Sequence, residues 1–509
     1  MKVKRFISAV LTGALLFGMG VPCCAADGQP FAEGTAGVER FRIPALITLK
    51  SGRLLASADA RYGHGTDSPA NIDTVVSYSD DNGKNWSKPV KVNYFSDVDN
   101  GNNEKVVTAS ASFIDSALCE DSDGKIYLIT NACPAFIGCP TSKKSGTGLI
   151  DGKIVLCDKT SADEMESVKL DKEHYPYYIG SFKNGYAPIL RFSDKKVYKK
   201  YYIDTEYNLY TLDGEEYKKV KVPVIGSDGE LTDKKTQANV FYAHSPVKLY
   251  PAFYTWLRTS TDGGKTWSKP KILNKDIGTS GFTGVCPGRG FVYKYNGKER
   301  VMFGVYDDNG GREYTSIIYS EDGGKTWTRG EKASKVGTAG KSSESQLVKM
   351  NNGVIRMYSR NTAGYISYTD STDGGHSWGK YKLDKSLKYT SNCMVSFINY
   401  SKKIDGKKAI IAAYPTSKNR KLGIIKIGLY DESNKVEWKY SYKVTEDKTD
   451  LTYVYSCLTE LLNGKIGLLY ESQAAELTYK TFSVSELKVN EEQQSFFKRL
   501  WTAFFGLFR

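Results

Sequence analysis

Residues 320–327 read Ser-Glu-Asp-Gly-Gly-Lys-Thr-Trp, and the same pattern returns at 79–86, 260–267 and 371–378. The shared form is Ser-x-Asp-x-Gly-x-(Thr/Ser/Asn)-Trp. Each copy follows an alternating apolar run, such as the one at 317–319. The glycine supplies the positive φ of a tight turn, the aspartate can accept backbone N–H bonds, and the tryptophan can pack onto the sheet. The pattern therefore predicts a hairpin turn between antiparallel strands.

Repetition of this hairpin predicts an all-β chain. One unit cannot bury its apolar face alone, so several copies imply a radial array of small sheets, which is a β-propeller. The last three copies begin at 260, 320 and 371, close to the spacing of about 40–50 residues for a propeller blade. The long gap after the first copy must hold another blade and inserted material. A degenerate fifth copy occupies 431–438.

The composition fits a hairpin-rich protein. The 509 residues include 36 Tyr and 48 Gly but only 15 Pro, and 13% of the chain is aromatic, which favours strands over helices. The net charge is +14, yet the lysines alternate with acidic residues and form no long basic run. We therefore expect a solvated basic surface that attracts anionic glycans, and no nucleic-acid partner.

The chain divides into five predicted parts. Residues 1–26 have the basic start, apolar stretch and small residues of a secretory signal, which predicts a secreted or cell-surface protein. The propeller is expected at 27–134 and 251–488. Between its two parts the turn pattern disappears and short Tyr- and Lys-rich runs take over, so residues 135–250 are predicted to form a small inserted β domain.

The last part, residues 489–509, is an amphipathic tail. Its apolar residues share one helical face in the stretch Phe496–Arg509. This stretch is too short to span a bilayer. It fits either peripheral contact with a membrane surface or docking onto the propeller.

Cysteine and histidine give no sign of a metal or cofactor. Seven cysteines remain beyond the signal, an odd number without CxxC pairs, which argues against a disulfide framework or a zinc site. One disulfide among Cys119, Cys133 and Cys139 stays open. The four histidines are scattered. The acidic stretch 97–101 lacks the full ligand spacing of a calcium loop and is left unassigned.

An arginine stands in a strand start that otherwise looks buried, within Phe41-Arg42-Ile43-Pro44. A buried guanidinium needs an anionic partner. Together with the repeats, this motif resembles the bacterial sialidases (neuraminidases), in which the repeat is called the Asp box, over about residues 30–485. The resemblance implies a six-bladed propeller and a retaining exo-α-sialidase that removes terminal sialic acid from glycoproteins, glycolipids or oligosaccharides.

The resemblance also implies a set of substrate-binding residues. Three arginines clamp the sialic-acid carboxylate in that family, and the matches here are Arg42, Arg360 and Arg420. Guanidinium groups bind carboxylates bidentately and stay charged at any working pH. Arg61 matches a further arginine that contacts a sugar hydroxyl. Asp115 resembles the aspartate that lines the pocket for the sugar's substituents.

The catalytic residues implied by the resemblance are Asp67, Tyr455 and Glu344. Asp67 lies in the Gly-rich loop 61–69 and matches the general acid/base, with Asp59 and Asp73 as competitors. Tyr455 matches the nucleophile and Glu344 the glutamate that activates it. These assignments leave one rival open for the nucleophile, the nearby Tyr453.

A tyrosine nucleophile has an electrostatic reason. The anomeric carbon of sialic acid bears its own carboxylate, and a second carboxylate about 4 Å away would add roughly 4 kcal/mol of repulsion at an effective dielectric near 20. This corresponds to about three orders of magnitude in rate. A neutral phenol avoids the repulsion but needs an adjacent base.

Four alternatives to a hydrolytic sialidase remain. The same site could run a trans-sialidase or an intramolecular trans-sialidase reaction. The subgroup that performs the intramolecular reaction has a bulky aromatic after the nucleophile strand, and the stretch 470–476 here is short and lacks Trp, which favours hydrolysis. A non-catalytic sialic-acid-binding adhesin and an Asp-box glycosidase for a neutral sugar are further possibilities. The latter would leave the arginines without a ligand.

Overall fold

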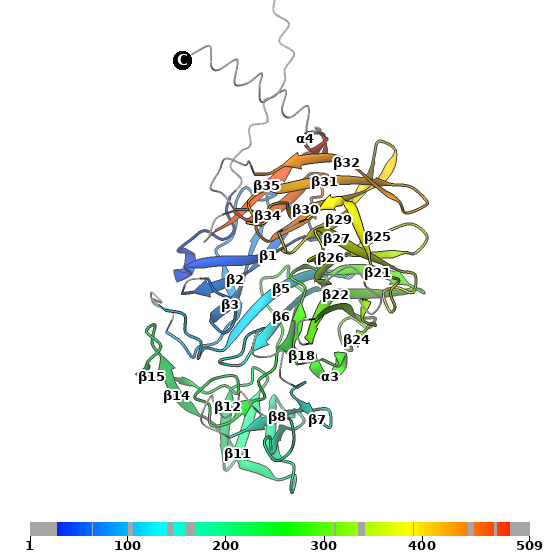
Figure 1. Ribbon diagram of the computed structural model, residues 1–509. Helices are drawn as coiled ribbons and strands as arrows, with labels where there is room; N and C mark the ends of the chain where they lie inside the picture. Colours follow the sequence, from blue (N-terminus) through cyan, green and yellow to red (C-terminus); the bar gives the residue numbers. More distant parts are fainter. Residues whose placement is uncertain are drawn as a thin grey trace, which may run out of the picture.

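The computed structural model shows an all-β chain arranged as a six-bladed propeller with a further β unit at one end (Figure 1). The structure describes residues 28–488 apart from 64, 100–104, 140–145, 159–168, 280, 310–311, 334–341, 390, 446–451 and 473–475. The helices with bounds wholly inside this described part are single turns: η1 (Thr35–Gly37), α3 (Asn274–Ile277) and α4 (Val484–Leu487).

The first three blades are built as follows. Blade one contains β1 (Arg40–Thr48), β2 (Leu54–Tyr62), β3 (Asn71–Ser79) and β4 (Val90–Asn93). Blade two contains β5 (Ser112–Glu120), β6 (Ile126–Cys133), β17 (Tyr254–Ser260), β18 (Lys271–Ile272) and the short β20 (Gly288–Arg289). Blade three contains β19 (Thr283–Val285), β21 (Phe291–Tyr295), β22 (Lys298–Asn309), β23 (Arg312–Ser320) and β24 (Thr328–Arg329).

The other three blades follow without interruption. Blade four contains β25 (Ser342–Lys349), β26 (Ile355–Asn361), β27 (Tyr365–Ser371) and β28 (Lys382–Lys388). Blade five contains β29 (Ser396–Ile404), β30 (Lys407–Pro415), β31 (Gly423–Tyr430) and β32 (Val436–Lys443). Blade six contains β33 (Ser456–Glu460), β34 (Ile466–Glu471) and β35 (Leu477–Phe482). Inner strands β25, β29, β33, β1 and β5 lie next to one another in turn around the ring.

The four Asp-box repeats form the predicted turns. In the third copy Ser320 Oγ donates to Asp322 Oδ1 at 2.8 Å and accepts the Gly324 N–H at 2.8 Å, while Asp322 accepts the Thr326 N–H at 2.9 Å. The indole of Trp327 donates to the Gly324 carbonyl at 3.2 Å. The other copies repeat the serine and aspartate bonds. The structural role predicted for these residues is confirmed.

The degenerate copy at 431–438 differs. Ser433 bonds Asp431 across the turn between β31 and β32. Trp438 lies within β32 and donates instead to Asp384 Oδ2 at 2.8 Å, in the neighbouring blade. This turn therefore keeps the aspartate but uses its tryptophan to join two blades.

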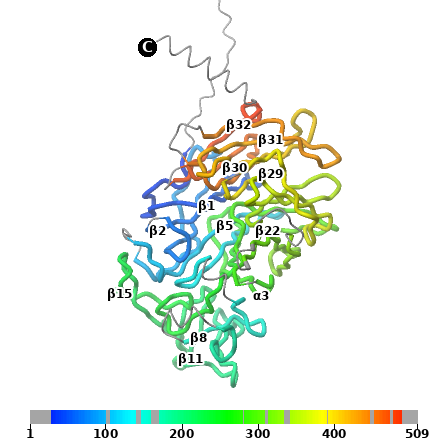
Figure 2. The backbone as a smooth tube through the Cα atoms, viewed as in Figure 1, coloured from blue at the N-terminus to red at the C-terminus, as the bar shows by residue number. Residues whose placement is uncertain are grey.

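The β unit at the lower end of Figures 1 and 2 comes from the chain between β6 and β17. Its main sheet contains β7 (Leu149–Ile150), β8 (Lys153–Cys157), β9 (Tyr177–Ile179), β10 (Tyr186–Arg191), β11 (Val197–Asp204), β12 (Leu209–Asp213), β13 (Glu216–Lys219) and β16 (Lys248–Leu249). A separate hairpin contains β14 (Lys221–Ile225) and β15 (Leu231–Gln237). Phe113 and Trp256 of blade two share one hydrophobic cluster with Tyr207 and Phe241 of this unit, so the two parts have a continuous core.

Two backbone hydrogen bonds join the hairpin β14–β15 to the loop that follows β4 of blade one, at residues 97–99. The Ile225 N–H donates to the Asp97 carbonyl and the Asp99 N–H donates to the Ile225 carbonyl, each at 2.8 Å. The Asp97 side chain is buried and accepts the Ala111 N–H at 2.7 Å, whereas its Oδ1 has no hydrogen-bond partner among the described residues. Burial raises the pKa of Asp97 to about 7.

The contribution of Asp97 to the free energy of unfolding should therefore fall as the pH rises. The folded chain holds a proton on Asp97 that the unfolded chain releases near pH 4, so this contribution is fully present below about pH 4 and is lost as the pH approaches 7. We expect Asp97→Asn, which keeps the acceptor for Ala111, to exceed the wild type by about 2–4 kcal/mol in free energy of unfolding at pH 8 and to match it near pH 4. Urea unfolding at both pH values measures this. The control Asp99→Asn, at a partly exposed carboxylate that pairs with Lys234, should not stabilise the protein at pH 8.

The ring closes between its two sequence ends. Phe31 forms a β-bridge with Leu477 of β35, so the start of the described chain completes the last blade. Across the same seam, the Leu46 N–H donates to Cys457 Sγ at 3.3 Å and the Thr48 N–H donates to Thr459 Oγ1 at 3.0 Å. Blades one and six are therefore joined by hydrogen bonds between residues more than 400 positions apart in the sequence.

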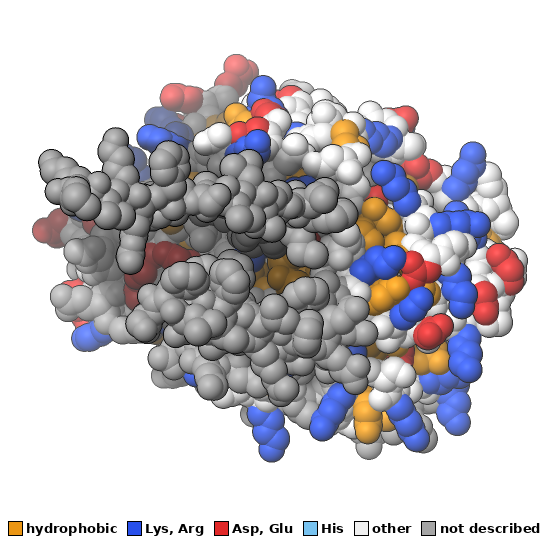
Figure 3. Space-filling view, turned by 90° about the horizontal axis from the view of Figure 1, so that it is seen from above, with side chains coloured by type: hydrophobic (Ala, Val, Ile, Leu, Met, Phe, Trp, Pro, Cys, Tyr) orange, Lys and Arg blue, Asp and Glu red, His pale blue; other side chains and the backbone are white. Residues whose placement is uncertain are grey.

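The surface carries dispersed charge. In Figure 3, Lys and Arg side chains are scattered between acidic ones over the part of that face that is described. No helix among the described residues is long and apolar enough to cross a membrane. The predicted signal at 1–26 and the tail at 489–509 lie outside the described residues. Cys119 and Cys133 are buried free thiols, so no disulfide links the described cysteines at 119, 133 and 139.

Candidate active site

Seven of the eight residues predicted from the sequence line one cavity of about 240 Å³. They come from five of the six blades and meet in one cavity: Arg42, Asp67, Asp115, Glu344, Arg360, Arg420 and Tyr455. The eighth, Arg61, is buried directly behind Asp67. The structure thus brings together residues up to 413 positions apart, from Arg42 to Tyr455.

Tyr455 lies at the middle of this cluster. Its Oη donates to Glu344 Oε1 at 2.5 Å and accepts a bond from Arg360 Nη1 at 2.9 Å. Arg360 Nη1 also donates to Glu344 Oε2 at 2.8 Å. The three side chains therefore form a closed triangle of a phenol, a buried carboxylate and a guanidinium.

The other two arginines flank the same ring. The guanidinium carbon of Arg42 lies 5.9 Å from the centre of the Tyr455 ring, and that of Arg420 lies 6.0 Å from it. Arg420 is held by the carbonyls of Ser391 and Asn392 at 3.3 and 2.6 Å. Three positive groups from three blades thus surround one phenol.

Burial and the charge of Glu344 raise the pKa of Tyr455 well above its usual value, although Arg360 opposes this shift. The free phenol is therefore protonated, and it can attack only if its proton leaves during the reaction. Glu344 is the hydrogen-bond partner that can take this proton.

Asp67 projects toward solvent at the rim, with 67% of its side chain exposed. Its Oδ1 accepts bonds from Arg61 Nη1 at 2.5 Å and from Arg42 Nη1 at 3.4 Å. Burial acts to raise the pKa of Asp67, but Arg61 and Arg42 outweigh it and hold the pKa below its usual value. The free site thus keeps this carboxylate ionised and reachable.

The two competitors of Asp67 have other partners. Asp59 is fully buried and accepts a bond from Arg61 Nη2 at 2.8 Å, and burial raises its pKa to about 6. Asp73 is also buried and pairs with Lys91 at 2.7 Å. Neither lines the cavity, so Asp67 is the one of the three that can reach a substrate there.

Asp115 lines the cavity and is linked to Arg61 through Asp59. Its backbone has a φ of 63°, and its N–H donates to Asp59 Oδ1 at 3.2 Å. Burial, followed by the charges of Asp59 and Glu344, raises the pKa of Asp115 well above its usual value. A protonated carboxyl here can donate a hydrogen bond to a sugar oxygen.

Tyr453 is not part of the cavity. Its side chain is fully buried and stacks on Tyr470, with ring centres 4.9 Å apart. The strand β33 begins only at Ser456, so the alternation expected of a strand does not apply at 453–455. Packing between blades five and six, rather than a place in the cavity, accounts for this tyrosine.

Glu471 and Asn392 hold the arginines in place and were not predicted. Buried Glu471 accepts the Ile43 N–H at 2.8 Å and Arg42 Nε at 3.3 Å. Asn392 Oδ1 accepts Arg360 Nε at 3.0 Å. Glu471 could have been found from the sequence, because it is a carboxylate at the end of the otherwise apolar strand 466–471. Nothing in the sequence marked Asn392.

An apolar wall was also missed. Phe253, Phe282, Tyr306 and Ile114 line the cavity beside the charged groups. Phe282 contacts both Phe253 and Tyr306, with ring centres 4.8 and 5.3 Å apart. These aromatics come from strand ends scattered over blades two and three, so no local pattern links them.

Several side chains of the cavity lie next to irregularities of the backbone that set their direction. Register shifts interrupt β1 after Arg42, β5 after Ile114 and β25 after Ser342, next to Arg42, Asp115 and Glu344. Bulges re-aim side chains in this way. Positive φ values at Ile43 (56°), Asn392 (43°) and Arg420 (55°) add to this. Such conformations are strained for residues other than glycine and cluster at functional sites.

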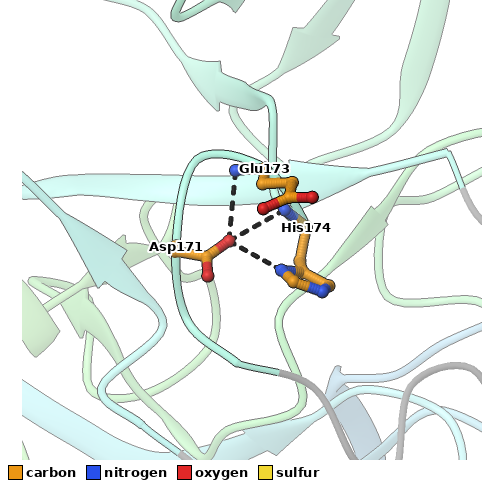
Figure 4. A group of neighbouring side chains, drawn as sticks. All are labelled: Asp171, Glu173 and His174. Carbon is orange, nitrogen blue, oxygen red and sulfur yellow. Dashed lines mark hydrogen bonds and ion pairs between the residues drawn. The ribbon is translucent and has the colours of Figure 1, made fainter.

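The inserted unit holds one acidic cluster with a histidine, Asp171, Glu173 and His174 (Figure 4). Asp171 Oδ1 accepts the N–H groups of Glu173 and His174 and contacts His174 Nδ1 at 2.7 Å. These bonds are those of an Asp-capped turn. The cluster is explained as local structure and shares no residue with the cavity.

Comparison with known proteins fits this picture. The family of BNR repeat-like domains matches residues 208–468, more than half of the chain, and the BNR/Asp-box repeat matches residues 77–88. The chain is 33% identical over 487 residues to an anhydrosialidase from Macrobdella decora and 34% identical over 475 residues to sialidase B from Streptococcus pneumoniae. Each match covers 89% of this chain, which spans 59% and 64% of the two relatives.

A solved structure is similar over its whole length. The intramolecular trans-sialidase from Ruminococcus gnavus, in complex with oseltamivir carboxylate, is 31% identical with a TM-score of 0.78, and the alignment covers 92% of this chain and 99% of that one. Fold and site together define an Asp-box propeller with an arginine-lined central pocket. The chain belongs to the sialidase family of BNR-repeat propellers.

Proposed function

We propose that this protein is a retaining exo-α-sialidase that cleaves terminal sialic acid from glycoproteins, glycolipids or oligosaccharides, and that it acts outside the cell. The observation that carries the proposal is the convergence of Arg42, Arg360 and Arg420 on Tyr455. Three guanidinium groups form a site for one carboxylate, and a neutral phenol is the nucleophile that a carboxylate-bearing carbon does not repel.

In the first step, Tyr455 Oη attacks the anomeric carbon and gives its proton to Glu344. The glycosidic bond breaks, and Asp67, which has taken up a proton from solvent when the substrate bound, protonates the departing oxygen. In the second step, Asp67 takes a proton from water, the water oxygen attacks the anomeric carbon, and the tyrosine oxygen leaves while regaining its proton from Glu344. Two inversions give overall retention, and every proton returns to its starting group.

Substrate binding itself prepares the acid. Arg42 and Arg61 hold the pKa of Asp67 low in the free site. A substrate carboxylate beside Arg42 neutralises part of this positive charge, and the apolar wall reduces contact with water. Both effects raise the pKa of Asp67 when the sugar is bound.

A leaving-group comparison tests Asp67. We expect Asp67→Asn to lower kcat/KM about 10²–10⁴-fold for a sialyl-lactose, whose alkoxide leaving group needs protonation. The loss should be much smaller for a sialoside of an acidic phenol, which leaves without a proton. Initial rates on both substrates measure this. Equal losses on both would exclude Asp67 as the general acid, and an unaffected enzyme would exclude it from the reaction.

Intramolecular transfer is the second candidate. It is favoured by the similarity to relatives described as an anhydrosialidase and an intramolecular trans-sialidase, and by the aromatic wall, which restricts water. Both reactions share the first step and differ only in whether water or a hydroxyl of the sugar itself displaces the tyrosine. The stretch 470–476 lacks a tryptophan, which favours water; its residues 473–475 lie outside the described part.

Product analysis separates these functions. Mass spectrometry of the released sugar gives free sialic acid for hydrolysis and a product lighter by one water for intramolecular transfer. A sialylated acceptor would indicate transfer between molecules. Binding of a sialoside without any cleavage would indicate an adhesin and overturn the proposed activity.

A further inference from the structure

A second cavity, of about 370 Å³, lies between blades four and five. It is lined by Ser386 and Lys388 of β28 and by residues of blade five that include Tyr414, Lys426 and Lys443. None of its described lining residues is acidic, and none is shared with the central cavity. Its volume is within the range of about 300–1,000 Å³ for small-molecule sites.

The register of blade five explains how the lysines come together. Tyr414 of β30 pairs with Ile424 of β31, and Ile424 pairs with Lys443 of β32, so these three side chains lie on one face. Lys426, two residues along β31, lies on the same face. Farther along, this face is apolar and packs against blade four through Phe397. The lysines thus replace apolar residues at the open end of an interblade groove.

The lysines of this cavity lack ion-pair partners among the described residues, although burial and then the nearby charge of Asp384 raise the pKa of Tyr414. Lys388, Lys426 and Lys443 form no ion pair with any described carboxylate. Asp384, on the same strand as Lys388, already accepts the Trp438 indole N–H at 2.8 Å. Three lysines directed at one cavity repel one another, which an anion would relieve.

A second observation points to a ligand. Tyr414 lines the cavity, is fully buried, and its Oη has no hydrogen-bond partner among the described residues. A buried hydroxyl without a partner is uncommon and costs free energy. The Tyr414 hydroxyl and the three ammonium groups together offer donors for one oxyanion.

The cavity is connected to the central site through one turn. Thr416 and Leu422 line the lysine cavity, and Arg420, which lies between them in the sequence, lines the central cavity. The turn is held by the Leu422 carbonyl, which accepts the Thr416 N–H at 2.7 Å. A glycan held at the outer cavity therefore lies beside the turn that carries an arginine of the sialic-acid site.

We propose that this cavity binds a sugar residue bearing a sulfate or carboxylate group, held by Lys388, Lys426, Lys443 and the Tyr414 hydroxyl. The site is separate from the catalytic pocket and recognises a second anionic group of a branched or neighbouring glycan. Only the choice of a glycan rests on the proposed function; the anion site follows from the cavity itself.

The test measures binding of N-acetylglucosamine 6-sulfate by calorimetry at fixed ionic strength. We expect the triple variant Lys388→Ser, Lys426→Ser, Lys443→Ser to bind at least about tenfold more weakly, and Tyr414→Phe to bind several-fold more weakly. The control triple variant Lys84→Ser, Lys265→Ser, Lys294→Ser makes the same charge change at exposed lysines of other blades and should bind like the wild type.

Further binding measurements show which ligand binds and in which of the two cavities. Unsulfated N-acetylglucosamine should not bind measurably, and binding should persist in Arg360→Ala, which disables the central site. Inorganic sulfate binding as tightly as the sulfated sugar would mean an adventitious ion only and overturn the proposal. An equal loss of sugar binding in the control triple variant would also overturn the proposal. The same holds if Arg360→Ala loses sugar binding while the lysine triple variant retains it. Cleavage of a simple sialoside is measured separately and tests only the proposed function.

Discussion

Replacing Tyr455 with phenylalanine should lower kcat on a fluorogenic sialoside at least about 1,000-fold. Phenylalanine keeps the ring that lies near Arg42 and Arg420 but removes the oxygen that, in the proposed mechanism, attacks the anomeric carbon. Tyr455 is the cavity side chain whose hydroxyl is seen to donate to a carboxylate. Water would then have to attack directly, without the covalent intermediate that divides the reaction into two easier steps.

Tyr453→Phe is the matched control for this experiment. The Tyr453 hydroxyl is buried, has no hydrogen-bond partner among the described residues and lies outside the cavity, so its loss should leave kcat nearly unchanged. Circular dichroism checks that both variants are folded. Comparable losses in the two variants, or more than a tenth of the activity remaining in Tyr455→Phe, would exclude Tyr455 as the nucleophile.

Glu344→Gln should lower kcat about 10²–10⁴-fold. The amide oxygen can still accept one of the two bonds made by Arg360 and Tyr455, but the NH2 group that replaces the other oxygen cannot accept, and the amide cannot take the phenol proton. Because the pKa of Tyr455 is raised well above its usual value, the phenol does not ionise without this base. The variant also leaves the largely buried Arg360 without its counter-ion, so unfolding in urea should occur at lower concentration.

Glu313→Gln provides the corresponding control. Glu313 lines the same cavity but is not in contact with Tyr455 or Arg360 through any hydrogen bond seen among the described residues. The same loss of one negative charge from the pocket should change kcat only a few-fold. Equal effects of the two substitutions would mean that Glu344 acts through the general field of the pocket and not as a base.

The fold was predictable because its signal is local and repeated. Each Asp-box turn is complete within eight residues, as the bonds of Asp322 show, and four copies specify four similar hairpins. Arg42 was predictable for another reason: it stands in an apolar context where a charge is costly without a partner, whereas the family resemblance alone pointed to Arg360 and Arg420. Both inferences need only short stretches of sequence.

The precise site was less predictable because its geometry depends on nonlocal contacts. Glu471 fixes Arg42 from a strand 429 positions away, and Asn392 fixes Arg360 from another blade. The positive φ values at Ile43 and Arg420 place side chains where a regular strand would not. The composition of these segments does not encode these φ angles, because contacts with the surrounding blades impose them.

The seam between blades one and six has a consequence for biogenesis. Arg42 is synthesised near the beginning of the chain, whereas Tyr455 and Glu471 emerge near its end, and Phe31 reaches Leu477 only when the circle is complete. A chain that is still on the ribosome, or that ends prematurely, therefore lacks a complete active site. During renaturation, recovery of sialoside cleavage would report the final joining of the two termini, later than signals from any individual sheet.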